Sequence, residues 1–205
     1  MPEEMVASMV DVQYALQGNA LPRDHRPALA AALERHVPWL SDPAQAGLHR
    51  VNTVSGSGPT ALLSQRARLA LRVRRERVVD LAPLSGATLD VGGFALRLGE
   101  VPTVRELLPY GTLYAHLVAS RDDDELAFLA AIEDELGALG VPCRAICGRR
   151  QVIDVDGVPL VGFSLMLDGL SGAGSLRVLE SGLGRHRRLG CGVFVPHKSA
   201  AALRA

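Results

Sequence analysis

The chain has 205 residues, a formal net charge of zero and a hydrophobic content of 48%, which is ordinary for a globular protein. This length is ample for a hydrophobic core and fits one domain or two small ones. The balanced charge argues against indiscriminate nucleic-acid binding, and no apolar run is long enough to span a membrane.

The cysteines and the N-terminus indicate a cellular compartment. Glu3 and Glu4 stand where a signal peptide has its basic start. Cys143, Cys147 and Cys191 are odd in number and form no Cys-x-x-Cys motif, so we expect reduced thiols and a cytoplasmic location. No acidic cluster has the spacing of metal ligands, and we therefore expect neither a metal nor a cofactor.

The first half of the chain alternates strand and helix patterns. Residues 5–16 predict a strand, and Pro27 then begins a helix, because proline suits a first helical turn. Proline at position 38 marks the end of that helix. The further predicted elements are strands at 47–51 and 68–73, a short helix at 78–84, and a hairpin of 88–91 with 94–98 around Gly92-Gly93.

The second half shows a similar order. Residues 112–118 predict a strand, and residues 125–139 predict an amphipathic helix with Gly140 as its cap. The side chains expected to face inward from this helix are Leu126, Leu129, Ile132 and Leu136. A strand beginning near 142–147, a hairpin of 152–155 with 158–167 around Asp156-Gly157, a helix capped by Ser175 that runs to about Ser181, and a last strand at 191–195 complete the series.

Each half therefore reads as strand, helix, strand, strand, helix, strand, which is the ferredoxin-like order. We predict an α+β protein with tandem ferredoxin-like (RRM-like) βαββαβ domains. The expected domains are an N-terminal half at residues 1–100, a linker at 101–111, and a C-terminal half at 112–205 that carries a glycine-rich loop.

That loop contains two Gly-apolar-Gly triplets, Gly182-Leu183-Gly184 and Gly190-Cys191-Gly192, separated by five residues. Three of the five are arginines: Arg185, Arg187 and Arg188. Glycine allows backbone N–H groups to turn outward at positive φ, where they bind anions, and arginine fits phosphate oxygens bidentately. The pattern predicts a phosphate-binding loop. It is not a Walker A motif, because no Gly-Lys-Ser/Thr follows.

The two triplets, their spacer and the final strand that leads into residues 195–199 resemble the C-terminal loop of the CRISPR repeat-cleaving endoribonucleases. These enzymes belong to the repeat-associated RNA-binding (RAMP) superfamily, and the resemblance is to a compact type I branch. It implies metal-independent cleavage of precursor CRISPR RNA within the repeat, by attack of a 2′-hydroxyl that leaves a 2′,3′-cyclic phosphate. The implied partners are the repeat RNA, the mature crRNA and other proteins of a type I surveillance complex, with no membrane.

This reaction needs a base, an acid and positive charge, and histidine is the usual choice for proton transfer near neutral pH. His49, in Leu48-His49-Arg50, matches the placement of the family's catalytic histidine after the first helix. His36 and His186 remain alternatives, whereas we expect His25 to be solvated. Candidate supporting groups are Tyr14 and Arg50. The chain departs from members that use a lysine near the histidine, because Lys198 is its only lysine.

The predicted RNA-binding residues combine the loop with basic residues elsewhere. They are Gly182, Gly184, Arg185, His186, Arg187, Arg188, Gly190, Gly192, Lys198, Arg50, Arg68, Arg72 and Arg74. The last three lie on a strand that alternates basic and apolar residues, which favours RNA over a small anion. Two other functions remain open: a non-catalytic crRNA-binding subunit, and a tandem ferredoxin-like protein that binds a small anionic ligand.

Overall fold

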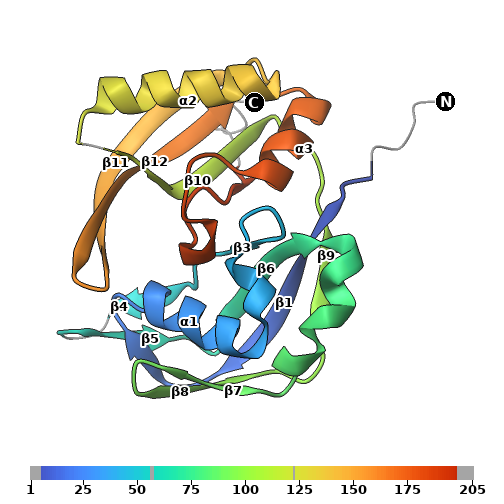
Figure 1. Cartoon of the computed structure of the whole chain (residues 1–205), viewed down its shortest axis with the longest axis vertical. Coiled ribbons are helices and arrows are strands. Elements are labelled where there is room, and N and C mark those ends of the chain that lie inside the picture. Colours follow the sequence, from blue (N-terminus) through green and yellow to red (C-terminus); the bar gives the residue numbers. More distant parts are fainter. Residues whose placement is uncertain (1–5, 56–57, 122, 198–205) are drawn as a thin grey trace, which may run out of the picture. The chain divides into compact units, whose positions relative to one another are not determined.

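The computed structural model describes residues 6–55, 58–121 and 123–197, shown in Figure 1. The chain forms two compact units. The N-terminal unit consists of residues 9–106 together with 188–190. The C-terminal unit contains the described residues of 1–8, 107–187 and 191–205. No helix in the described ranges is both long and apolar enough to cross a membrane.

The N-terminal unit is built on a six-stranded sheet in the order β3-β6-β1-β8-β7, with β9 also paired to β1. A separate three-stranded sheet has the order β2-β5-β4. The elements are β1 (Met9–Gln17), β2 (Ala20–Pro22), α1 (Arg26–His36), the 3-10 helix η1 (Pro38–Ser41), β3 (Ala46–Leu48), β4 (Thr53–Ser55), β5 (Thr60–Leu63), β6 (Arg68–Arg74), the 3-10 helix η2 (Arg75–Leu84), β7 (Thr88–Val91), β8 (Phe94–Leu98) and β9 (Thr103–Glu106).

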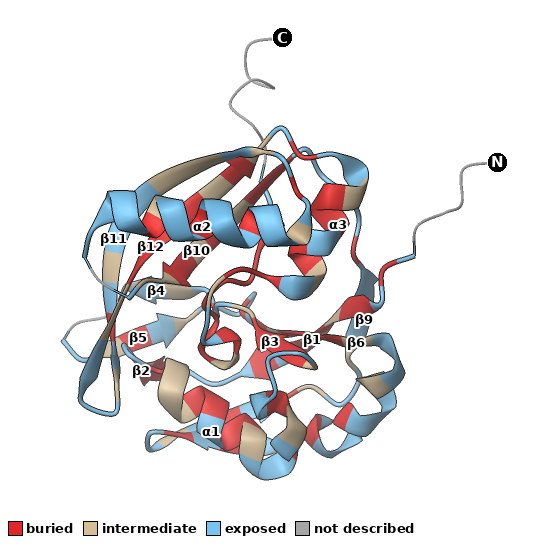
Figure 2. Cartoon of the chain, turned by 45° about the horizontal axis from the view of Figure 1, so that its top comes forward, coloured by how far each residue is buried: buried red, intermediate tan, exposed pale blue. Residues whose placement is uncertain are grey.

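Alternation along β1 and β6 creates the core of this unit. Val10, Val12 and Tyr14 of β1 are fully buried, and Leu69 and Val73 of β6 are buried in the same cluster. Successive side chains of a strand point to opposite faces, so the residues between them form a second, polar face. The apolar residues of α1 complete the cluster, as the buried stripe of this helix in Figure 2 shows.

The fourth strand of the N-terminal ferredoxin-like order is β9, where the sequence pattern predicts a linker. Thr103–Glu106 pairs antiparallel with β1, and Val12 lies opposite Val104. All four residues of β9 are exposed. No side chain of this strand is buried, so its sequence shows no alternation of buried and exposed residues. The strand is defined instead by its backbone hydrogen bonds to β1. The prediction that residues 101–111 form a linker is therefore wrong for these four residues.

The C-terminal unit has the order βαββαβ over a four-stranded sheet, β11-β12-β10-β13. Helices α2 and α3 cover one face of this sheet (Figures 1 and 2). The elements are β10 (Thr112–Ala119), α2 (Glu125–Leu139), β11 (Arg144–Val155), β12 (Val158–Asp168), α3 (Gly172–Ser181), the 3-10 helix η3 (Arg187–Leu189, shared by both units) and β13 (Val195–Pro196). The predicted α+β class and the repeated element order are confirmed.

Helix α2 has the predicted bounds. The Asp124 carboxylate accepts hydrogen bonds from two backbone N–H groups of the first turn, and Gly140 ends the helix at φ 63°. One predicted inward residue is wrong, because Leu126 is 77% exposed. The helix buries Phe128, Ile132 and Leu136, which are spaced four residues apart and lie along one side of the helix. Leu126 does not fit this spacing.

Two predicted boundaries near the C-terminus differ from the structure. Ser171 caps α3, whereas Ser175 is buried within the helix and its hydroxyl accepts the backbone N–H of Tyr110. The last strand is limited to Val195–Pro196, which pairs with β10. Residues 191 and 192 belong instead to the closure of the glycine-rich loop. Both predicted hairpins, around Gly92-Gly93 and Asp156-Gly157, are confirmed.

Candidate functional site

His49 directly follows β3 in the N-terminal unit. Its backbone N–H donates to the carbonyl of Ala70 at 2.9 Å, which extends the pairing of β3 with β6. Gly47 lies opposite Arg72 in that pairing, and His49, two residues further, faces the same side of the sheet. The imidazole therefore lies on the polar face, and its side chain is 11% exposed.

Asp11 and Arg72 hold the histidine ring. Nε2 of His49 lies 2.9 Å from Oδ1 of Asp11. Arg72 lies directly opposite Asp11 on β6 and donates to both of its oxygens, from Nε at 2.8 Å and from a terminal nitrogen at 2.9 Å. Arg72 is 1% exposed. The bidentate geometry fixes the carboxylate, which in turn fixes the ring.

The charge state of Asp11 determines which histidine nitrogen carries a proton. Burial alone raises the pKa of Asp11, but the hydrogen bonds and charges of His49 and Arg72 outweigh it, so that the pKa lies well below its usual range. An ionised carboxylate only accepts hydrogen bonds, and Nε2 must therefore donate. In the neutral ring, Nδ1 is the nitrogen that can accept a proton.

The glycines of the loop allow close contacts between backbone segments. In the C-terminal unit the Leu183 N–H donates to the Gly192 carbonyl at 3.2 Å. A Cβ atom on Gly192 would lie 1.8 Å from the Leu183 oxygen, and one on Gly182 would lie 2.4 Å from the Gly192 oxygen. Both glycines have positive φ. Their first role is closure of the loop, where no side chain fits.

The sequence predicts that the N–H groups of this loop turn outward to bind an anion. This prediction is wrong at several positions, where the N–H group donates to an acceptor within the protein. Gly182 donates to Val178, Gly192 donates to Leu117, and Cys191 donates to His186, in each case to a backbone carbonyl. The Gly184 N–H instead donates to the Oε2 atom of Glu135 on α2, at 2.7 Å. The protein itself therefore occupies the N–H groups that the sequence assigns to phosphate.

Residues 188–190 of the loop belong to the N-terminal unit and pack beside His49. Arg188 forms an ion pair with Glu34 of α1 at 2.8 Å, and the Leu189 carbonyl accepts from Arg26 at 3.2 Å. A Cβ atom on Gly190 would lie 3.1 Å from the Leu48 oxygen and 3.8 Å from the Arg50 nitrogen. This glycine thus faces the backbone on both sides of the candidate catalytic histidine.

The other candidate residues for proton transfer occupy less suitable places. His36 is exposed at the end of α1, and His186 is exposed at φ 68°. His25 is buried rather than solvated; burial lowers its pKa, although its ring contacts the Pro22 carbonyl at 3.1 Å. Tyr14 lies on the core face, opposite to Asp11, and its hydroxyl donates to Leu81 at 3.3 Å. It therefore cannot support His49.

The predicted RNA-binding arginines separate into exposed and buried groups. Arg50, Arg68 and Arg185 are exposed. Arg74 is partly buried and donates to the Ala44 carbonyl. Arg72 and Arg187, which are also among the predicted RNA-binding residues, are buried, with 1% and 5% of their surface exposed. Lys198 lies outside the described residues.

Sequence reasoning missed Asp11, which contacts His49, and Glu135, which accepts the Gly184 N–H. The only sequence signal for Asp11 is its place between Val10 and Val12, which puts it on the face away from the core. Its partners could not be identified without the strand register. Within the described ranges, no group of three or more His, Cys, Asp or Glu residues could hold a metal ion.

Comparisons with known proteins agree with one another. A family model described as Cas6 Crispr matches residues 10–199. The CRISPR-associated endonuclease Cas6 of Myxococcus xanthus strain DK1622 is 39% identical over 197 residues, which are 96% of this chain and 85% of that protein.

Solved structures share the fold at low sequence identity. One described as CRISPR associated protein Cas6 matches with a TM-score of 0.68 at 9% identity, and covers 93% of this chain and 100% of its own. The CRISPR endoribonuclease Cse3 bound to 19 nt RNA matches with a TM-score of 0.52 at 13% identity, over 91% of this chain and 97% of its own. These two likenesses establish a common tandem ferredoxin-like fold.

Proposed function

Because the chain belongs to the Cas6 family of CRISPR proteins, we propose that it is a metal-independent endoribonuclease that cleaves precursor CRISPR RNA within the repeat. The relative from Myxococcus xanthus is described as an endonuclease, and Cse3, which shares the fold, is described as an endoribonuclease bound to RNA. The observation that carries the proposal is the oriented His49, held by Asp11 beside Gly190 of the glycine-rich loop.

The reaction is an internal transesterification. The 2′ oxygen of one nucleotide forms a bond to the adjacent phosphorus while the bond from phosphorus to the 5′ oxygen breaks. The products are a 2′,3′-cyclic phosphate and a free 5′-hydroxyl. One proton leaves the attacking hydroxyl and one reaches the departing oxygen, so that no redox partner or external nucleophile is needed.

His49 is the proposed general acid or base. With Nε2 donating to Asp11, Nδ1 accepts a proton in one protonation state and donates it in the other. Asp11 stabilises the imidazolium that forms, as a carboxylate does behind a catalytic histidine. Arg50, adjacent in sequence and exposed, is the proposed source of positive charge near the phosphate.

We further propose that the product stays bound and that the protein acts as a subunit of a type I surveillance complex. Support for this step comes from family membership alone. After cleavage, the phosphate charges that bind the protein remain on the RNA, and nothing in the reaction removes them. Size-exclusion chromatography of a completed reaction separates retained from released product.

The decisive experiment incubates the protein with the CRISPR repeat RNA of its own locus, with and without EDTA. Wild type is expected to cut one site in both conditions. A 2′-deoxy nucleotide just upstream of that site should block cleavage and leave binding intact, because it removes only the nucleophile. Cutting of the deoxy substrate, or loss of activity in EDTA, would show a hydrolytic, metal-dependent nuclease instead.

Substitution of His49 identifies the catalytic group. His49→Ala should reduce cleavage by about a hundred- to ten-thousandfold and leave RNA affinity nearly unchanged. His36→Ala is the matched control, since this histidine is exposed at the end of α1. If the His49→Ala protein cleaves at the wild-type rate, the role of general acid or base returns to His36 or His186.

A further inference from the structure

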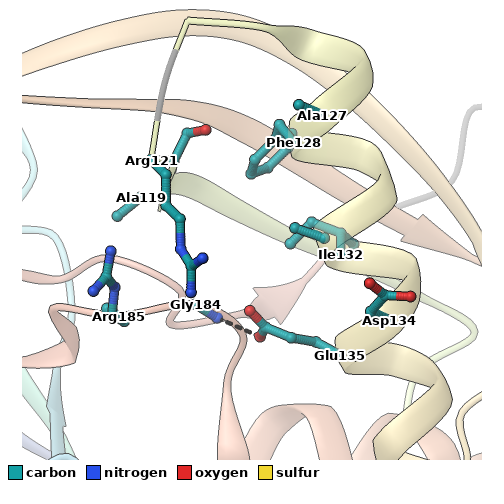
Figure 3. A pocket seen from close by; sticks show the side chains of 11 residues that line it. Ala119, Arg121, Ala127, Phe128, Ile132, Asp134, Glu135, Gly184 and Arg185 are labelled. Atoms are coloured by element: carbon teal, nitrogen blue, oxygen red, sulfur yellow. Dashed lines mark hydrogen bonds between the residues drawn. The ribbon is translucent and has the colours of Figure 1, made fainter.

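The C-terminal unit contains a pocket of about 490 Å³ between α2, the end of β10 and the first part of the glycine-rich loop (Figure 3). Its charged lining consists of Arg121, Arg185, Glu135 and Asp134, and the Gly184 backbone also faces it. Phe128 and Ile132 of α2 supply apolar walls. The volume is within the range of small-molecule sites and is sufficient for one nucleotide.

One N–H group in this pocket already binds an anion. The Gly184 N–H donates to the Glu135 carboxylate at 2.7 Å, drawn as the dashed line in Figure 3. The neighbouring N–H groups of Gly182 and Gly192 donate to backbone carbonyls, which belong to the fixed framework of the unit. The partner of Gly184 is different, because a glutamate side chain can rotate away from an exposed helix face.

Two arginines face the same pocket. Arg121 and Arg185 are exposed, and neither guanidinium has a hydrogen bond or an ion pair with any described residue. Figure 3 shows the Arg121 side chain extending toward Gly184. These two guanidinium groups, without a partner among the described residues, lie beside a bound carboxylate and form a site that a second anion could enter, because guanidinium binds phosphate oxygens in a planar fork.

We propose that this pocket binds one phosphodiester group of the RNA at Gly184, and that Glu135 occupies the position in the free protein. The proposal rests on the RNA-binding function proposed above. The entering phosphate accepts the Gly184 N–H and the N–H groups of Arg121 and Arg185, while Glu135 rotates into solvent. The exchange replaces one anion by another at the same N–H group, so the backbone of the loop need not move.

The exchange makes an unusual prediction, namely that removing a negative charge at the site strengthens RNA binding. Glu135→Gln keeps an oxygen that can accept the Gly184 N–H but removes the negative charge that competes with phosphate. RNA affinity should therefore rise by about two- to tenfold. The control is Glu133→Gln, which removes the same charge from an exposed position on α2 outside the pocket.

Substitutions of Arg121 test the arginine side of the proposed phosphate site. Arg121→Gln should weaken binding and reduce the slope of log affinity against log salt by about 0.7, the value for one phosphate contact on a single strand. Arg121→Lys should restore most of the slope, because the charge returns. Binding is measured by fluorescence anisotropy with repeat RNA carrying the 2′-deoxy block, between about 50 and about 200 mM salt.

Three results would overturn the proposal. The first is an equal change of RNA affinity in Glu135→Gln and Glu133→Gln, and the second is an unchanged salt slope in Arg121→Gln. The third is weaker RNA binding by Glu135→Gln together with a lowered melting temperature. The last result would show that Glu135 only supports the loop. Cleavage by wild type and loss of cleavage in His49→Ala are independent of all three. Failure of this inference therefore leaves the proposed nuclease function intact. A wild-type protein that neither binds nor cleaves the repeat RNA would instead refute the nuclease function itself.

Discussion

Nε2 of His49 and Oδ1 of Asp11 lie 2.9 Å apart, and the same oxygen accepts Nε–H of Arg72 at 2.8 Å. A residue from the end of β3 and one from β1 thus meet on the polar face of the sheet, with β6 between their strands. The carboxylate is bound from both sides. Its orientation does not depend on solvent, and the tautomer of the imidazole is set before any substrate arrives.

Asp11→Asn tests this arrangement directly. The amide keeps the size of the carboxylate but can present an N–H to His49 and cannot stabilise an imidazolium as well. Cleavage should fall by about tenfold or more, and the lower limb of the pH–rate profile should move, because the charge that favours the imidazolium is gone. A purely structural role for Asp11 would lower the melting temperature without moving the pH profile.

Asp11 should also make stability depend on pH. Its pKa in the folded protein is lowered, so its contribution is fully present above the usual pKa of aspartate and is lost as pH falls below that value. Wild type should therefore lose stability in acid more steeply than Asp11→Asn. Urea unfolding of both proteins across a series of acidic buffers measures the two slopes. Parallel curves would mean that Asp11 is not held as an ion in the folded state.

Two glycine substitutions should have opposite effects on stability. Gly192→Ala places a Cβ atom 1.8 Å from the Leu183 oxygen at φ 65° and should destabilise the protein by more than about 2 kcal/mol. Gly137→Ala, within α2, meets no heavy atom within 4 Å and should stabilise by about 0.5–1 kcal/mol. Thermal unfolding distinguishes them, and a stable Gly192→Ala protein would contradict the close backbone contact.

The three arginines of the loop should behave differently when each is changed to alanine. Arg185 is exposed, and its loss should reduce RNA affinity and the salt slope. Arg188 pairs with Glu34 and Arg187 is 5% exposed, so their loss should act on the loop itself. Melting temperature measured beside RNA binding separates the two kinds of effect. Equal losses of salt slope for all three would restore the original expectation of a uniform basic loop.

Much of the fold could be predicted because hydrophobic periodicity and turn residues act locally. The bounds of α2 and the hairpin at Asp156-Gly157 follow from such signals. Strand β9 could not be predicted, since it is defined by backbone pairing with a distant strand and buries no side chain. Local pattern specifies an element well only where its own residues enter the core.

The site was only partly predictable for a related reason. His49 could be singled out from its neighbours in sequence, but its partners come from two other strands, at positions fixed by register. Arg72 illustrates the limit, because its place in an alternating basic strand predicts exposure. The structure buries it against Asp11, where one ion pair outweighs the pattern.

The N-terminal unit is discontinuous, and this has a consequence for how the protein is made. Its segment 188–190, in which Arg188 pairs with Glu34 and Gly190 closely approaches the Leu48 backbone, is synthesised only after the whole of residues 107–187. The sheet and helix of residues 9–106 can assemble much earlier during synthesis. The surroundings of His49 are therefore completed only after residues 107–187 have been synthesised, so a chain that stops before residue 188 lacks part of this neighbourhood.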